Sequence, residues 1–351
     1  MIEIDGRRGE GGGQMLRTAL ALSAWLGRPF RMTNIRARRT QPGLKAQHLT
    51  AVEMVGRICG ATVEGAEPRS GTLTFLPGRV APGVYEQEVG TAGATTLVAQ
   101  AAALPLLRAA GPSRLSIGGG THVAWAPPAE YLRDVYAALL ARLGLRLDVT
   151  LERHGFFPRG GGRIEVAIEG SEAVPDAGPL RLERPARQQL RIEATAVVVS
   201  LPRVIAERML VSATRRLGER HWRVRERIVE LAGPTGTYLF IRVFARDDAG
   251  AARPACLLAG FTGLGELGKP AEVVGQEAAG EALAFLQSDA SLDCRGADQA
   301  LLPALIAGRE LSFRTDRVTE HLRTQAATIA LFLGPCVEIA ADGRVRVRPP
   351  A

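Results

Sequence analysis

Hydrophobic and polar positions follow one another in the same order three times along this chain. Each copy begins with a helix of small and aliphatic residues, passes through a short break into a strand, and reaches a second helix. A glycine and two strands close the copy. Such recurrence predicts a repeated supersecondary unit. The predicted helices are 14–23 and 45–58, then 94–107 and 129–143, then 297–306 and 321–333. The predicted strands are 30–35, 60–64 and 73–75, then 113–117, 144–149 and 162–168, then 311–313, 334–339 and 343–347.

In each copy the second helix is followed by a glycine, which adopts the left-handed backbone of a helix C-terminus without a Cβ penalty. Near the start of these helices stand His48, Tyr131 and His321, at almost the same distance before the glycine. A helix N-terminus carries partial positive charge and unpaired N–H groups. These three residues are therefore predicted to lie in equivalent places that suit phosphate. The three glycines are Gly60, Gly144 and Gly334.

Each copy is βαβαββ-like, and one copy alone cannot cover the apolar faces of its helices and sheet. Three copies packed around a shared axis can. The segment between the second and third copies breaks the pattern with a strand at 191–199, a helix at 204–217 and a strand at 237–244. We therefore predict an α/β (α+β) fold of three βαβαββ repeats with a smaller α/β domain inserted between repeats two and three. The predicted domains are 1–183 for repeats one and two, 184–262 for the insert, and 263–351 for the third repeat.

Composition places the chain among globular proteins. It has 351 residues, of which 46% are hydrophobic and 23% charged, enough for a large core. It has no run of about eighteen apolar residues, and it begins with a strand-like segment and no apolar leader with a cleavage site. We expect no membrane association and a cytoplasmic location. The four cysteines are far apart and form no C-x-x-C pair, so their spacing indicates neither a disulfide framework nor a zinc site, and we expect them reduced and mostly buried.

Arginine supplies most of the positive charge. The net charge is +8, and only Lys45 and Lys269 are lysines among 44 basic residues. This bias fits either arginine-rich codon usage over a solvated surface or an electropositive groove for a polyanion. The cluster at 36–39 favours the groove, because three guanidiniums in four positions can clamp a phosphate. It leads into a helix with Gln47 and His48 in its first turn.

A glycine-rich loop at 9–14 leads into the first helix, with Arg17 one turn further on. Glycines let backbone N–H groups approach an anion, although the spacing matches neither the dinucleotide nor the P-loop motif. A plain turn is the alternative. Glu10 argues for a ligand, because a carboxylate beside a phosphate repels it unless Mg²⁺ or Mn²⁺ lies between them.

Three further segments carry chemistry-bearing residues with simpler alternatives. Prolines around Pro127, beside Tyr131, provide either a flat apolar wall for a purine or an ordinary helix entry. The nearby His122 is compatible with a surface loop, and the segment 153–162 is predicted to be a β-turn with aromatic packing. Asp298 and Gln299 begin a helix, where an aspartate can be merely a cap, and His321 alone at a helix start is more often structural.

Taken together, these motifs resemble the RNA 3′-terminal phosphate cyclase family over nearly the whole chain. The family's fold, three βαβαββ units with a smaller inserted domain, agrees with the repeats. The motifs that carry the resemblance are 9–14 with Leu16 and Arg17, Ile35 and Arg36 with Arg39 and 42–44, 47–49, 126–128, 154–156 with 160–162, and 297–299.

The resemblance implies an ATP-dependent reaction at an RNA end that carries a 3′-phosphate. The family's nucleophilic histidine falls on His321, which would form a covalent histidinyl-AMP and pass AMP to the RNA 3′-phosphate. Attack by the neighbouring 2′-OH would then give a 2′,3′-cyclic phosphate. A neutral imidazole is a competent nucleophile near pH 7.

The resemblance also assigns the other residues. Glu10 would bind the divalent metal, Mg²⁺ or Mn²⁺. The substrate phosphate site would comprise Arg17, Arg36, Arg39, Gln47 and His48. The nucleotide pocket would comprise Gln100, Pro127, Tyr131, Arg295, Gly296, Ala297, Asp298 and Gln299. The family often has tyrosine and leucine where this chain has Arg295 and Gly296, so a guanidinium would replace an aromatic ring against adenine.

Two other readings stay open. A non-catalytic relative could bind structured RNA during ribosome assembly with the same fold and basic groove, but His321, Glu10 and Asp298 together argue against it. The second alternative is an enzyme that transfers a group to or from a small phosphorylated metabolite, but this function would give His321 no role. The sequence leaves the oligomeric state open between monomer and homodimer.

Overall fold

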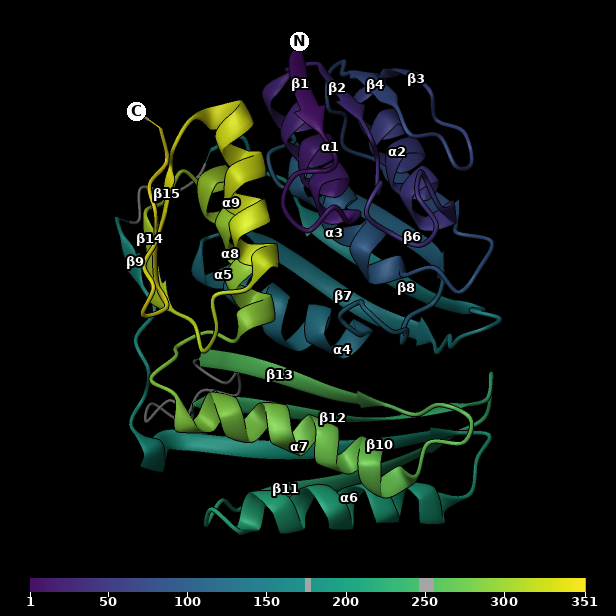
Figure 1. Cartoon of the computed structure of the whole chain (residues 1–351), viewed down its shortest axis with the longest axis vertical. Helices are drawn as coiled ribbons and strands as arrows, with labels where there is room; N and C mark the ends of the chain where they lie inside the picture. The colour runs from purple at the N-terminus through teal and green to yellow at the C-terminus, as the bar shows by residue number, and fades with distance from the viewer. Residues whose placement is uncertain (174–177, 246–255, 351) are drawn as a thin grey trace.

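The computed structural model describes residues 1–173, 178–245 and 256–350. The strands of these residues form four sheets of four strands each, with helices packed on them (Figure 1). The predicted α/β fold is confirmed.

Three of the sheets have the same topology. Their orders are β1-β2-β4-β3, β5-β6-β8-β7 and β9-β14-β16-β15. In each, the first two strands are parallel and the other neighbours are antiparallel. The first unit contains β1 (Ile2–Asp5), α1 (Gln14–Leu26), β2 (Phe30–Thr33), α2 (Ala46–Cys59), β3 (Thr62–Glu64) and β4 (Leu73–Leu76). The second contains β5 (Val84–Glu88), α3 (Thr95–Leu106), β6 (Ser113–Gly119), α4 (Ala129–Tyr131), the π-helical turn η1 (Leu132–Tyr136), α5 (Ala137–Arg142), β7 (Arg146–Arg153) and β8 (Gly162–Glu169). The third contains β9 (Leu180–Arg181), α8 (Cys294–Ile306), β14 (Leu311–Arg314), α9 (Glu320–Leu333), β15 (Val337–Ile339) and β16 (Arg344–Val347).

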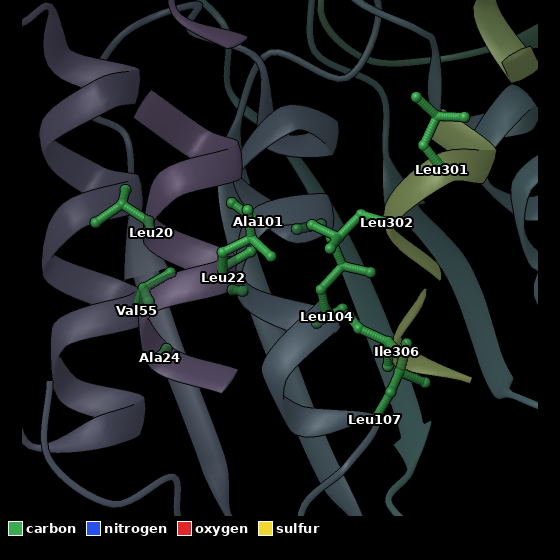
Figure 2. Packing of buried hydrophobic residues seen from close by; sticks show 14 of the residues in the cluster. Leu20, Leu22, Ala24, Val55, Ala101, Leu104, Leu107, Leu301, Leu302 and Ile306 are labelled. Atoms are coloured by element: carbon green, nitrogen blue, oxygen red, sulfur yellow. The ribbon is translucent and has the colours of Figure 1, made fainter. Parts of the chain in front are cut away.

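The helices of the three units share one hydrophobic core. Helix α1 packs against α2, α3 and α9, and α9 packs against α8. Figure 2 shows Leu22 of α1 beside Ala101 of α3, and Leu104 of α3 beside Leu302 of α8. Each fully buried leucine of this kind contributes roughly 1.5–3 kcal/mol. This packing fixes the N-termini of α1, α8 and α9 relative to one another.

The fourth sheet, β11-β10-β12-β13, forms the inserted part, which lies below the three units in Figure 1. It has its own core, in which Met209, Phe261 and Phe285 are buried. Its elements are β10 (Leu190–Val199) preceded by the 3₁₀ turn η2 (Arg187–Gln189), α6 (Arg203–Gly218), β11 (Val224–Leu231), β12 (Gly236–Ala245), β13 (Cys256–Leu264) and α7 (Ala271–Gln287).

The inserted elements extend beyond the segment 184–262 that the sequence suggested. Helix α7 packs against α6, β12 and β13, and its apolar side belongs to the core of the inserted part. An amphipathic pattern shows which face of a helix is buried but does not identify the sheet that buries it. Strand β9 precedes the insert and pairs with β14, so the third unit is assembled from segments on both sides of the insert.

The cysteines whose side chains the structure describes are Cys59, Cys294 and Cys336, and all three are free and buried. The side chain of Cys256 lies outside the described residues. Among those residues, no helix is both long enough and apolar enough to cross a bilayer.

Candidate active site

The glycine-rich loop, α1, α8 and α9 bring residues from the two ends of the chain together. Gln14 is the first residue of α1, Asp298 lies in the first half of α8, and His321 is the second residue of α9. The loop approaches α2 closely at Gly13, where a Cβ would stand 2.2 Å from the Nε2 atom of His48. Only glycine fits at such a contact, which explains one of the glycines in the motif.

Gln14 connects Asp298 with His321. Its Nε2 donates to Oδ2 of Asp298 across 2.9 Å, and its Oε1 lies 3.1 Å from Nδ1 of His321. An ionised carboxylate only accepts, so the amide must turn its oxygen to the imidazole, and Nδ1 must carry the proton. The Nε2 lone pair of His321 is then free. The side chain of His321 is 54% exposed, so a ligand can reach it.

Several charges act on the pKa of His321. Partial burial lowers the pKa below its ordinary value, Asp298 raises it, and the cations Arg17 and Arg39 lower it further. The net direction is downward, so the imidazole is neutral at pH 7 and able to act as a nucleophile.

Two carboxylate oxygens beside His321 have few partners among the described residues. Oδ1 of Asp298 has none, and Oε2 of Glu10 has only the imidazole of His321 beside it. Oε2 of Glu10 lies 2.8 Å from Nδ1 of His321, and its other oxygen pairs with the Arg39 guanidinium. Buried unpartnered oxygens are unusual, and hard oxygen donors are what Mg²⁺ and Mn²⁺ prefer. The residues present therefore fit a divalent metal.

Burial dominates the ionisation of Asp298 and Arg17. It raises the pKa of Asp298 from 3.8 to about 7, although His321 and Gln14 oppose the shift. It also lowers the pKa of Arg17 to about 10, partly offset by the charge of Asp298. Arg17 therefore remains a cation at neutral pH, whereas Asp298 titrates in that range.

His48 lies next to Arg17 and is neutral. Burial, together with the cations Arg17, Arg36 and Lys45, lowers the pKa of His48 to about 3. Its Nδ1 accepts from the backbone N–H of Lys45 at 3.2 Å, so the proton is on Nε2. The Nε2–H group of His48 faces Gly13, and the guanidinium of Arg17 is the next nearest group to the place where a Cβ of this glycine would stand. The two side chains form a donor pair suited to a phosphate.

The remaining predicted phosphate residues have other partners. Arg36 is buried, and its Nη1 donates to the carbonyl oxygens of Gln41 and Gly43, both at 2.8 Å. Arg36 thus holds the loop that carries Arg39. Gln47 accepts from the backbone N–H of Ala94 at 2.9 Å and joins the first unit to the second.

Most of the residues predicted for the nucleotide pocket lie in α8 or contact its first turns. Gln100 of α3 donates to Gln299, the residue after Asp298, across 2.6 Å. The carbonyl of Pro127 accepts from Thr96 at 2.7 Å. Gly296 and Ala297 are buried in the first turns of α8.

Tyr131 and Arg295 make contacts that the sequence did not suggest. The tyrosine is 1% exposed, and its hydroxyl donates to both oxygens of Asp293, at 2.9 and 3.1 Å. Tyr131 therefore holds Asp293, the residue that precedes α8, through its hydroxyl group. The guanidinium of Arg295 forms two hydrogen bonds, at 2.8 and 3.0 Å, with Glu281 of α7.

Two histidines lie together outside this site. His122, for which the sequence left a surface loop open, is 1% exposed. His154, in the segment predicted to be a β-turn with aromatic packing, packs against His122 and Tyr238. Of the alternatives that the sequence left open for His122, the surface loop does not apply, because Tyr238 of strand β12 in the inserted part stacks on its ring. Gln14 is the residue of the active site whose role the sequence missed. Its position at a helix start directly after the glycines was the available signal.

A neutral imidazole with a free Nε2, next to cations and oxygen donors for a metal, is an arrangement that suits the class of phosphoryl-transfer sites. Comparison with known proteins agrees with this class and narrows it. Residues 8–339 match the RNA 3′-terminal phosphate cyclase family, and the chain belongs to that family.

Three relatives with the name RNA 3′-terminal phosphate cyclase show how far the similarity extends. The protein of Nostoc punctiforme is 42% identical over 340 residues, covering 95% of this chain and 94% of the relative. That of Methylococcus capsulatus is 42% identical and covers 95% and 91%. That of Methanopyrus kandleri is 40% identical and covers 99% of both chains.

Proposed function

We propose that this protein converts the 3′-phosphate of an RNA into a 2′,3′-cyclic phosphate and, in the same reaction, converts ATP into AMP and pyrophosphate. The hydrogen-bonded series Asp298, Gln14 and His321 carries the proposal, because it leaves the Nε2 lone pair of a half-exposed neutral histidine free. Family membership supports the same reaction.

In the first step, Nε2 of His321 attacks the α-phosphorus of ATP. A P–N bond forms, the bond between the α-phosphorus and the bridging oxygen breaks, and pyrophosphate leaves. Gln14 accepts from Nδ1–H and stabilises the positive charge that develops on the ring. Arg17 and the Nε2–H group of His48 bind phosphate oxygens, and Gln100 with Gln299 contacts the nucleoside.

In the second step, an oxygen of the RNA 3′-phosphate attacks the phosphorus of the histidinyl-AMP. The P–N bond breaks, and His321 recovers its lone pair. In the third step, the 2′-OH of the terminal ribose attacks the RNA phosphorus, its proton passes to solvent, and AMP leaves. AMP is a far better leaving group than oxide, which is why the phosphate must first be adenylated. Glu10 would hold Mg²⁺ or Mn²⁺, which supplies positive charge against the phosphates when bound.

The purified protein should cyclise a 5′-labelled oligoribonucleotide with a 3′-phosphate when ATP and Mg²⁺ or Mn²⁺ are present. After the reaction, phosphatase should no longer remove the 3′-phosphate from the labelled oligoribonucleotide. A matched oligonucleotide with a 2′-O-methyl group on its last ribose lacks the nucleophile of the third step, so it should stop at the RNA-adenylate. An unchanged 3′-phosphate with both metals, in protein that still binds the RNA, would favour the non-catalytic RNA-binding alternative.

Adenylation of the protein should increase about tenfold between pH 6 and 8. Below about 7, where burial places the pKa of Asp298, the protonated carboxyl can donate to Gln14 and turn its NH₂ group to His321. Above this pH, the Asp298 carboxylate accepts from the NH₂ group of Gln14, and the amide oxygen again faces Nδ1 of His321. Titration of His321 itself lies at lower pH, because its pKa is below its ordinary value.

The variant Gln14→Leu provides the control for this pH profile. It keeps Asp298 and the fold of α1 but removes the amide that links the carboxyl to the imidazole. Its adenylation rate should be low and should lack the inflection near pH 7, measured as label from α-labelled ATP at each pH. A wild-type profile that is flat from pH 6 to 8, or the same inflection in Gln14→Leu, would contradict the role given to Asp298.

A further inference from the structure

A second cluster of ionisable side chains lies where the second unit meets the inserted part. His122, Glu130 and His154 come from the second unit, and Tyr238 comes from β12. The Nε2 atom of His122 lies 2.6 Å from Oε2 of Glu130. The Tyr238 hydroxyl donates to Oε1 of Glu130 across 2.5 Å and lies 3.1 Å from Nε2 of His154. One potential ligand atom each from His122, Glu130 and His154 lies within 4.8 Å of the others.

Most of the cluster is buried. His122 and Tyr238 are each 1% exposed and Glu130 is 9% exposed, whereas His154 is only partly buried. The rings of His122 and Tyr238 stack with centroids 4.0 Å apart, and Phe156 packs against both. The catalytic reaction proposed above uses none of these residues, so the cluster requires an explanation of its own.

Thr121 permits His122 to bind either a proton or a metal through Nε2. Its hydroxyl oxygen lies 2.8 Å from Nδ1 of His122, accepts from the N–H of Gly155 at 2.9 Å, and can donate to the Gly155 carbonyl at 3.4 Å. With Nε2 protonated, Thr121 donates to Nδ1. With a metal on Nε2, the proton moves to Nδ1, and Thr121 accepts it while donating to Gly155. This is the orienting hydrogen bond that a metal-bound histidine needs.

We propose that His122, Glu130 and His154, completed by Tyr238, bind one Zn²⁺ ion that fastens the inserted part to the second unit. Two imidazoles and a carboxylate form a donor set that zinc accepts, and imidazole disfavours Mg²⁺. With Tyr238 of the inserted part as the fourth donor, all four positions of a tetrahedral zinc ion are filled, and none is left for a substrate. The ion is therefore structural.

The spacing also agrees with coordination. Burial lowers the pKa of His154 to about 4, so its imidazole is neutral and keeps a nitrogen lone pair for a metal. Tetrahedral ligands at ordinary zinc bond lengths stand roughly 3.3 Å apart. For zinc to bind, the 2.6 Å contact between His122 and Glu130 must lengthen, and the longer separations, all within 4.8 Å, must shorten.

The test measures zinc alone in protein without a polyhistidine tag. His321→Ala serves as the background, because His321 next to Glu10 could itself take up zinc. After treatment with a chelator, this protein should bind one Zn²⁺ per chain in competition with a chromophoric chelator, and zinc should raise its Tm. Adding His154→Ala should weaken binding at least 100-fold and abolish the rise in Tm. Adding His221→Ala, at an exposed histidine of the inserted part, should change neither.

Cobalt provides a readout that needs no change in the cluster. Co²⁺ bound by two nitrogens and two oxygens in a tetrahedral site gives intense visible bands, whereas six-coordinate Co²⁺ at a carboxylate surface gives weak ones. Intense bands that disappear on addition of Zn²⁺ would support the proposal. Absence of stoichiometric zinc binding in the background protein, or equal affinity after His154→Ala, would overturn it and leave a hydrogen-bonded clamp between the two parts.

Discussion

Replacing His321 by alanine is expected to reduce covalent labelling of the protein by α-labelled ATP by at least 1,000-fold. Only the imidazole Nε2 supplies a lone pair at this position, and water cannot form the covalent intermediate in its place. The measurement is radioactivity that remains with denatured protein after incubation with Mg²⁺ or Mn²⁺. A phosphoramidate formed on wild type should be labile to acid, which distinguishes it from a phosphate ester.

Two comparisons make the His321 experiment specific. The variant His221→Ala alters an exposed histidine of the inserted part and should label like wild type. Glu10→Gln keeps the size of the side chain next to His321 but weakens metal binding, so its labelling should recover in part as the metal concentration is raised. Undiminished label in His321→Ala would move the nucleophile elsewhere, and His48 would be the next histidine to examine.

Much of the fold could be predicted because each element is encoded locally. Helix α9 was expected at 321–333 and is found at Glu320–Leu333, and α2 was expected at 45–58 and is found at Ala46–Cys59. Their apolar positions and terminal glycines depend on nearby residues alone. The assignment of α7 to the inserted core depends on tertiary packing, which periodicity does not contain.

The candidate site could be predicted only in part for the same reason. Resemblance drew attention to Glu10, Asp298 and His321, but no sequence spacing relates Glu10 to two residues that follow it by about 300 positions. The orientation of Gln14 between Asp298 and His321 became visible only once α1, α8 and α9 were packed together. Arg36 shows the opposite case, since a clustered arginine that looked like a phosphate ligand holds backbone carbonyls of its own loop.

Asp293 escaped attention in the sequence, although it connects three parts of the molecule. It is fully buried and accepts from the backbone N–H groups of Arg295 and Gly296, at 2.9 and 2.8 Å, as the N-cap of α8. It also accepts from the N–H of Gly260 in β13 at 3.2 Å and from the hydroxyl of Tyr131 in the second unit. Helix α8 carries Asp298, so the position of this cap sets the position of the active-site carboxylate.

The variant Asp293→Ala should therefore lower the free energy of unfolding by about 3 kcal/mol, because it leaves several buried donors without an acceptor. The matched control is Thr319→Ala, which removes the N-cap of α9 and a single hydrogen bond, to Leu322 at 3.1 Å, and should cost about 1 kcal/mol. The comparison is made by urea denaturation of both variants at pH 8. Burial raises the pKa of Asp293 to about 6, so its carboxyl is ionised at this pH. Equal losses would mean that Asp293 acts as an ordinary helix cap. A larger loss for Asp293→Ala, accompanied by weaker adenylation of the folded protein, would show that the carboxylate which joins the three parts also holds α8 in place for catalysis.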